Sequence, residues 1–300
     1  MKTARFISPS DFRSILKPRP KESHKGTWGH LLLVGGSINR LGAPLLSAWA
    51  ALRSGAGLVT LALPDRCYRK IPRGLLEVMY EPLPSTARGG FSRRASAPLK
   101  VLLKEKRAVA AGPGLGTTAD VRSLVVTLVQ HCPLPLVLDA DAINLLAGET
   151  EILKKRSGPV ILTPHPGEMG RLIGRTAAQV QKDRLRIASS FAKTHHVFVV
   201  LKGFHTVVAT PKGSCFINLT GNPGMATAGM GDVLTGMIGA LAAAYPLEEA
   251  ILAAVYIHGL AGDRVAKRLG GRGLLASDVI EEIPRVSKDL GTTFKQPSIA

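Results

Sequence analysis

The stretch HLLLVGGSINRLGAPLLSAWAALRSGAGLVTLALP, residues 30–64, contains two apolar runs separated by a helical pattern. The runs at 30–36 and 58–64 have the length and the apolar content of buried strands. Between them, Pro44 stands at a first helical position, and Gly55 with Gly57 ends the helix. A helix that connects two buried strands is typical of a parallel strand pair.

The same alternation continues along the chain and predicts the fold class. Thr176 and Gln179 form a capping box for a helix that runs to about His195, and the chain after residue 231 is mostly helical. We therefore predict an α/β fold, with a mostly parallel central sheet and helices on both faces, in a single domain over residues 1–300. The polar and basic segment 83–107 is interpreted as a surface loop. Further strands are expected at 108–114, 136–141, 160–164 and 197–203, with a hairpin at 206–219.

The charge and the cysteines limit the possible partners and compartments. Lysine and arginine number 39 against 21 aspartates and glutamates, and the net charge of +18 favours nucleic acid, acidic lipid or phosphate-bearing small molecules. The chain has no apolar run long enough to span a membrane, and its basic N-terminus lacks the apolar block of a secretory signal. We expect a cytoplasmic protein. Cys67, Cys132 and Cys215 are widely spaced and are expected to be reduced thiols in or near the core.

Polar or glycine-rich segments follow five of the predicted strands. They are GGS (35–37), GPGLG (112–116), DAD (139–141), TPHPGE (163–168) and KGFHT (202–206). Turn chemistry would explain any one of them alone. Because parallel strands end on one edge of a sheet, five together predict a binding crevice along that rim.

The segment GNPGMATAGMGDVLTGMIGALAAAY, residues 221–245, carries a glycine-rich loop directly into an apolar helix. Gly229, Met230 and Gly231 would present unpaired backbone N–H groups at the positive end of the helix dipole, which is an anion-binding arrangement. Asp232 would be the general base that takes a proton from a hydroxyl group attacking a phosphoryl group. The alternative is an aspartate that only stabilises the helix N-terminus. Neither a P-loop nor a dinucleotide-binding G-x-G-x-x-G motif is present.

His165 and Glu168 belong to the segment that follows the predicted strand at 160–164. His165 lies between Pro164 and Pro166, whose fixed φ angles would direct its side chain into the crevice. Glu168 falls in the first turn of the next helix, where it would cap the helix or help to order Mg²⁺.

Eight ordered motifs within about residues 24–285 resemble those of the ADP/ATP-dependent NAD(P)H-hydrate dehydratases, repair enzymes with a ribokinase-like fold. The motifs are SHKGTWGHLLLVGGS, GAPLLSAWAALRSGAGLVTLALP, AAGPGLG, LVLDADAINLLA, LTPHPGEMGRLIG, VVLKGFHTVV, NLTGNPGMATAGMGDVLTG and HGLAGD. The resemblance implies that Asp232 acts on the reacting hydroxyl. It also implies a site for the hydrated dinucleotide at Ala43, Gly114, His165 and Asp232, and a site for the adenine nucleotide at Lys202, Gly203, Phe204, His205, Thr206 and Gly231.

The implied reaction is dehydration of the S-form of hydrated NADH or NADPH, by phosphorylation of the ring hydroxyl from ADP or ATP and loss of phosphate. Mg²⁺ as cofactor and a homo-oligomer, a tetramer, are expected with it. His165 stands where related vitamin-precursor kinases have Asn in T-P-N-x-x-E, which favours the dehydratase. Met230 departs from the small residue that the family usually has between the two glycines, and we expect its side chain to point away from the loop.

Two alternative functions and one further expectation accompany this interpretation. A ribokinase-like kinase acting on a small alcohol would use the same Asp232. A nucleic-acid-binding protein would account for the positive charge, but the chain has no recognisable nucleic-acid module. Many members of the family carry an N-terminal epimerase domain, for which the 23 or so residues before SHKG leave no room, so the chain is expected to perform the dehydration alone.

Overall fold

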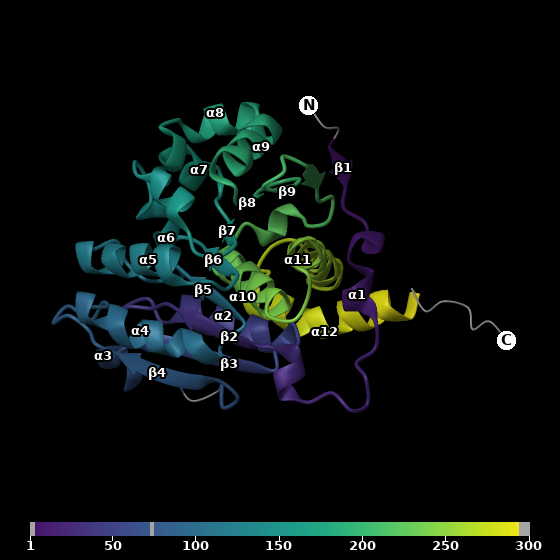
Figure 1. The fold of residues 1–300 in the computed structure, drawn as a ribbon. Coiled ribbons are helices and arrows are strands. Elements are labelled where there is room, and N and C mark those ends of the chain that lie inside the picture. Colours follow the sequence, from purple (N-terminus) through teal and green to yellow (C-terminus); the bar gives the residue numbers. More distant parts are fainter. Residues whose placement is uncertain (1–3, 73–74, 294–300) are drawn as a thin grey trace.

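The computed structural model describes residues 4–72 and 75–293. Their strands form one sheet in the order β1-β10-β9-β8-β7-β6-β5-β2-β3-β4 (Figure 1). Every neighbouring pair from β8 to β4 is parallel, whereas β9 pairs antiparallel with both β8 and β10. The predicted α/β class is confirmed. The strands are β1 (Arg5–Phe6), β2 (His30–Val34), β3 (Leu58–Pro64), β4 (Met79–Leu83), β5 (Ala108–Ala111), β6 (Leu136–Leu138), β7 (Val160–Leu162), β8 (Phe198–Leu201), β9 (Val207–Ala209) and β10 (Cys215–Ile217).

Helices cover both faces of the sheet, as predicted (Figure 1). Side chains of one strand alternate between the faces, so Leu31 and Leu33 join one buried cluster and Leu32 and Val34 the other. Helices α2, α10, α11 and α12 contribute to the first cluster, and α4, α5, α7 and α9 to the second. The helices are α1 (Arg13–Leu16), α2 (Gly42–Arg53), α3 (Asp65–Tyr68), α4 (Ser96–Leu102), α5 (Ala119–His131), α6 (Asp141–Asn144), α7 (Pro166–Ile173), α8 (Ala177–Lys182), α9 (Arg184–His195), α10 (Met230–Ala242), α11 (Leu247–Leu269) and α12 (Ala276–Thr293), with 3₁₀ turns at Pro9–Phe12, Lys25–Trp28, Arg93–Ala95, Leu103–Glu105, Thr150–Lys155 and Pro223–Met225.

The unit predicted over residues 30–64 is present, with one shift of a boundary. Strands β2 and β3 are parallel, with Leu31 opposite Val59, and α2 connects them. The helix begins at Gly42, so Pro44 is its third residue and not its first, and it ends just before Gly55, whose φ is +95°. Positive φ at Gly55 turns the chain out of the helix at little steric cost.

The interpretation of 83–107 as a surface loop is wrong. The segment forms two 3₁₀ turns around α4, and Phe91, Ala95, Leu99 and Leu103 are buried in the second cluster. The spacing of four residues places Ala95, Leu99 and Leu103 on one side of the helical backbone, and Arg93, Arg94 and Lys100 between them face solvent. The polar residues masked this apolar stripe in the sequence.

Two other expectations differ from the structure. The helix predicted from Thr176 to His195 is two helices, because Asp183 leaves helical geometry with φ of −147° and ends α8 before α9 begins. The edge strands β1 and β4 were not predicted, since β1 has two residues and β4 contains Pro82. The hairpin of β9 and β10 and the helices after residue 231 are confirmed.

The structure also bears on the predicted cysteines, on the predicted oligomer and on membrane spans. All three cysteines are buried and free, as predicted. The apolar residues of α10 and α11 are largely buried in the core, so these helices do not offer the exposed apolar face that would favour an oligomer. A homo-oligomer therefore stays a prediction. None of the helices within the described residues is both long and apolar enough to cross a bilayer.

The burial of α4 leads to a test of the corrected segment. Leu99 is 0% exposed and Val101, two residues later, is 62% exposed. We expect Leu99→Ala to lower the free energy of unfolding by about 2–5 kcal/mol, because it leaves a cavity in the core. Val101→Ala is the matched control and should change it by less than about 0.5 kcal/mol. Urea denaturation of both variants would contradict the packing of α4 if the two losses were equal.

Candidate active site

The five polar segments lie on one rim of the sheet, as predicted. They follow β2, β5, β6, β7 and β8, which run parallel to one another. Backbone hydrogen bonds join neighbouring segments. Gly36 N–H donates to Pro113 O at 2.9 Å, and Lys202 N–H donates to Pro164 O at 2.8 Å. The carboxyl ends of the strands therefore form a continuous floor for the crevice.

Lys202 lies at the centre of this rim. Its Nζ donates to Asp139 Oδ1 at 2.6 Å and lies 3.9 Å from Glu168 Oε2. Thr163 Oγ1 donates to the same Asp139 oxygen at 2.7 Å. Burial lowers the pKa of Lys202, but the negative charges of Asp139 and Glu168 outweigh it, so the pKa lies above its usual value. The ammonium therefore keeps its charge and links the ends of β6, β7 and β8.

Asp232 faces the same centre from the first turn of α10. Ser47 Oγ of α2 donates to the Asp232 carbonyl at 2.8 Å. The two helices approach closely at Gly236, where a Cβ would lie 2.0 Å from Ser47 O. Burial, followed by the charge of Asp139, raises the pKa of Asp232 to about 7, and Lys202 acts against this rise. A carboxylate with a pKa near neutrality is suited to act as a general base.

The loop before α10 has the geometry expected of an anion site. Gly229, with φ of +91°, caps the helix in a left-handed conformation. Met230 is 6% exposed and belongs to the first buried cluster, and it also lines the pocket beside the loop. The direction of its side chain stays a prediction. A Cβ on Gly231 would lie 3.3 Å from Lys202 Nζ. The helix N-terminus and the partly buried ammonium of Lys202 thus converge on one point, which suits a phosphate group.

A pocket of about 440 Å³ opens on one side of this point. The pocket brings together all the residues predicted to bind a nucleotide, because it is lined by the loop 202–206 and by Gly231. Arg184 Nη2 donates to Leu201 O at 2.8 Å, and its Nη1 donates to Phe204 O, so one guanidinium holds the loop. Phe204 is 74% exposed at this pocket.

Two of the residues predicted to bind the dinucleotide, Ala43 and Gly114, follow β2 and β5, which lie on the other side of β6 from β8 and the nucleotide pocket. Ser47 Oγ also donates to Ala43 O at 3.2 Å, so one hydroxyl connects Ala43 with Asp232. Ser37 Oγ donates to Gly114 O at 2.9 Å. His165 is the N-cap of α7, and burial lowers its pKa. Ala43 and Gly114 thus lie apart from the nucleotide pocket, whereas His165 follows β7, the neighbour of β8; the binding roles of all these residues stay predictions.

Glu168 serves as a helix cap. Its Oε2 accepts a hydrogen bond from His165 N–H at 2.8 Å, and the ring of His165 accepts from the N–H of Gly167. Among residues 4–72 and 75–293, no group of three or more His, Cys, Asp or Glu side chains is arranged to hold a metal ion. Mg²⁺ commonly binds through one or two carboxylates together with phosphate oxygens. A carboxylate beside the anion site fits that mode, so ligation by Glu168 stays a prediction.

Sequence reasoning assigned no role to Asp139, Arg184 or Asp263. Asp263 Oδ2 accepts from Gly221 N–H at 2.8 Å and its Oδ1 accepts from Asn222 Nδ2 at 3.0 Å, which fixes the loop along the nucleotide pocket. The sequence contained a signal for two of these residues. The motif DAD (139–141) places Asp139 directly at a strand end, and the motif HGLAGD (258–263) places Asp263 late in an apolar helix. Arg184 had no such signal.

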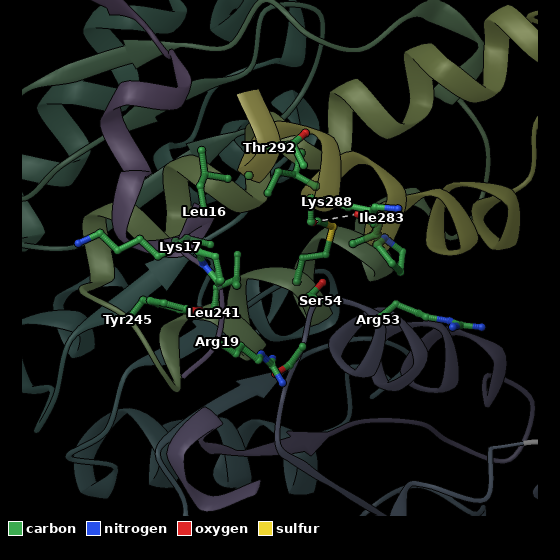
Figure 2. A pocket seen from close by; sticks show the side chains of 18 residues that line it. Leu16, Lys17, Arg19, Arg53, Ser54, Leu241, Tyr245, Ile283, Lys288 and Thr292 are labelled. Atoms are coloured by element: carbon green, nitrogen blue, oxygen red, sulfur yellow. Dashed lines mark hydrogen bonds between the residues drawn. The ribbon is translucent and has the colours of Figure 1, made fainter. Parts of the chain in front are cut away.

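A separate cavity of about 430 Å³ lies between the N-terminal segment, α2, α10 and α12 (Figure 2). Leu16 and Leu241 line it together with Tyr245, and the cations Lys17 and Lys288 also belong to its walls (Figure 2). None of the predicted site residues lines this cavity.

Comparison with known proteins gives consistent matches over most of the chain. The family model for NAD(P)H-hydrate dehydratase matches residues 31–285. A bifunctional NAD(P)H-hydrate repair enzyme from Moorella thermoacetica is 45% identical over 288 residues, which are 95% of this chain and 54% of the relative. The chain thus spans about half the length of that relative.

Two solved structures extend the comparison to the fold. The crystal structure of the ADP/ATP-dependent NAD(P)H-hydrate dehydratase from Bacillus subtilis, co-crystallised with ATP and Mg²⁺, matches with a TM-score of 0.85 and 35% identity, covering 97% of this chain and all of that one. A ribokinase-like superfamily protein from Enterococcus faecalis matches with a TM-score of 0.82 and 27% identity, covering 97% of each chain. The predicted ribokinase-like fold is confirmed.

The ion pair of Lys202 and Asp139 can be tested by stability. Lys202→Met should lower the free energy of unfolding by about 3 kcal/mol, because it leaves the buried Asp139 carboxylate without its cation. The double variant Lys202→Met, Asp139→Asn should lose less free energy of unfolding than Lys202→Met alone. Lys182→Met, at an exposed position on α8, is the matched control. Urea denaturation at pH 7 that showed equal stability for Lys202→Met and the control would contradict this role of the pair.

Proposed function

Because the chain belongs to the NAD(P)H-hydrate dehydratase family, we propose that it returns the S-form of hydrated NADH or NADPH to NADH or NADPH, with ADP or ATP as phosphoryl donor. One observation carries the proposal most strongly. Asp232, with its pKa raised to about 7, lies beside the Lys202 ammonium and the N-terminus of α10, between the nucleotide pocket and the rim that includes Ala43 and Gly114. A base, an anion site and two ligand sites therefore meet at one point.

The first step is phosphoryl transfer. The nucleotide occupies the pocket at Lys202–Thr206 and directs its terminal phosphate to Gly231 and the start of α10. Asp232 accepts the proton of the ring hydroxyl as its oxygen bonds to phosphorus, and the bond to the leaving nucleotide breaks. Backbone N–H groups of residues 229–231 and the Lys202 ammonium stabilise the charge on the transferred group.

The second step is elimination. Phosphorylation turns the hydroxyl into a better leaving group, and electrons from the ring nitrogen expel phosphate as the C–O bond breaks. Loss of a proton from the adjacent ring carbon then restores the reduced nicotinamide. Mg²⁺, when bound, would neutralise charge on the phosphates, and Glu168 would supply one of its oxygen ligands.

Several finer assignments belong to this proposal. The site roles of His165, Phe204, His205 and the other predicted residues are part of it, as is a single domain over residues 1–300. A cytoplasmic location and a tetramer stay predictions.

Substitution of Asp232 tests its role as the base. Asp232→Asn should abolish turnover of hydrated NADH, because an amide keeps the shape of the side chain but cannot accept the hydroxyl proton. Nucleotide binding, measured by calorimetry, should persist, and the melting temperature should match that of the wild type. Activity in Asp232→Asn close to that of the wild type would show that another group takes the proton.

Product stoichiometry separates the dehydratase from a kinase. Incubation with hydrated NADH, Mg²⁺ and either ADP or ATP should release inorganic phosphate and reduced nicotinamide in equal amounts, because the phosphorylated form is only an intermediate. A kinase would instead accumulate a stable phosphorylated alcohol. Such a product from another alcohol, with no turnover of hydrated NADH under either nucleotide, would favour the kinase.

A further inference from the structure

A basic cleft of about 860 Å³ lies on the same rim, beyond the ends of β3 and β4. Both strands are parallel to β2, so α3 and the segment 84–90 that follow them reach the edge of the sheet that holds the active site (Figure 1). Four cationic side chains line the cleft, three from α3 and the two residues after it and one from the segment 84–90. They are Arg66, Arg69, Lys70 and Arg88.

The cations of this cleft lack the partners that would explain them structurally. Within the described part of the chain, none of the four forms an ion pair, and all four are exposed. Asp65 is the carboxylate in the lining, and it already accepts a hydrogen bond from Ser85 Oγ. Arginine presents a planar fork of donors that matches phosphate oxygens. The cleft is therefore suited to a phosphate group.

The cleft adjoins the predicted dinucleotide side of the active site. Ile38, which lines the cleft, donates its N–H to Gly89 O at 3.1 Å. The preceding residue, Ser37, donates its hydroxyl to Gly114 O at 2.9 Å. The nucleotide pocket lies in the opposite direction, past β8. A ligand that extends from Asp232 past Gly114 would next reach this cleft.

Distance along the sheet points to the far half of the dinucleotide. Three strand spacings separate β6, which carries Asp139 at its end, from β3, or roughly 14 Å at about 4.8 Å each. With the nicotinamide ring at Asp232, the bridging pyrophosphate falls between the two ends and the adenosine ribose falls near the cleft. The phosphate on that ribose is the group that distinguishes hydrated NADPH from hydrated NADH.

We propose that Arg66, Arg88 and the neighbouring cations form a subsite for the 2′-phosphate of hydrated NADPH, so that the protein prefers this substrate to hydrated NADH. The subsite rests on the proposed dehydratase function. The subsite accounts for four of the surplus cations by one ligand group. The loop at Ile38 connects the subsite to the catalytic rim.

The test compares both substrates in matched variants. Wild-type protein should show a higher kcat/KM for hydrated NADPH than for hydrated NADH. The double variant Arg66→Gln, Arg88→Gln should lower the ratio of the two kcat/KM values by about tenfold or more, since each lost hydrogen bond to a charged group weakens binding. Arg94→Gln removes an exposed arginine that does not line the cleft, and it should leave the ratio unchanged.

Binding supplies a readout that does not depend on turnover. By calorimetry, the wild type should bind NADP⁺ more tightly than NAD⁺, and the double variant should lose most of that difference. An unchanged ratio in an active double variant, or an equal fall for both substrates, would overturn the 2′-phosphate subsite alone. A folded wild-type protein that regenerates neither substrate would contradict the proposed function instead.

Discussion

The partly buried ammonium of Lys202 holds together the strand ends at the centre of the active-site rim. Asp139, Glu168 and Asp232 bring three carboxylates to the ends of neighbouring strands and the start of α10, and their charges would repel one another without a cation among them. Lys202 extends from the end of β8 and bonds to Asp139 at 2.6 Å. It fixes the relative positions of three strand ends and at the same time limits how far the pKa of Asp232 rises. The positions of the strand ends and the pKa of Asp232 thus depend on the same side chain.

The fold places Asp232 between the two proposed ligand sites because its sheet is parallel from β8 to β4. The polar segments that follow these strands therefore lie at one edge of the sheet. Beyond β8, on the side of the nucleotide pocket, the sheet continues through the antiparallel strand β9 to β10 and β1. Close packing of α2 on α10 at Gly236 then brings Asp232 to the middle of that edge. In the proposed reaction, the donor nucleotide and the hydrated dinucleotide would approach the same carboxylate from opposite directions. The basic cleft beyond β3 extends the dinucleotide side.

Much of this arrangement could be predicted from the sequence, because strand length, glycine turns and polar strand ends are local signals. The rim, the loop at Gly229 and the choice of Asp232 followed from them. The pairing of Lys202 with Asp139 could not be predicted, since 63 residues separate the two and only the order of strands brings them together. Residues 83–107 were misinterpreted because basic residues surround the buried stripe that includes Leu99. The end of α8 at Asp183 could not be predicted, because the residues on both sides of Asp183 favour a helix.

The proposed reaction depends on a carboxyl group that titrates near neutrality at the centre of the rim. Direct titration by carbon NMR of protein labelled at the aspartate carboxyl carbons measures this property, and Asp232→Asn identifies the signal. We expect one aspartate with a pKa of about 7 in the wild type, and its signal should be missing from the variant. If every aspartate completed its titration below about pH 5, as unperturbed aspartates do, Asp232 would not be the group described here.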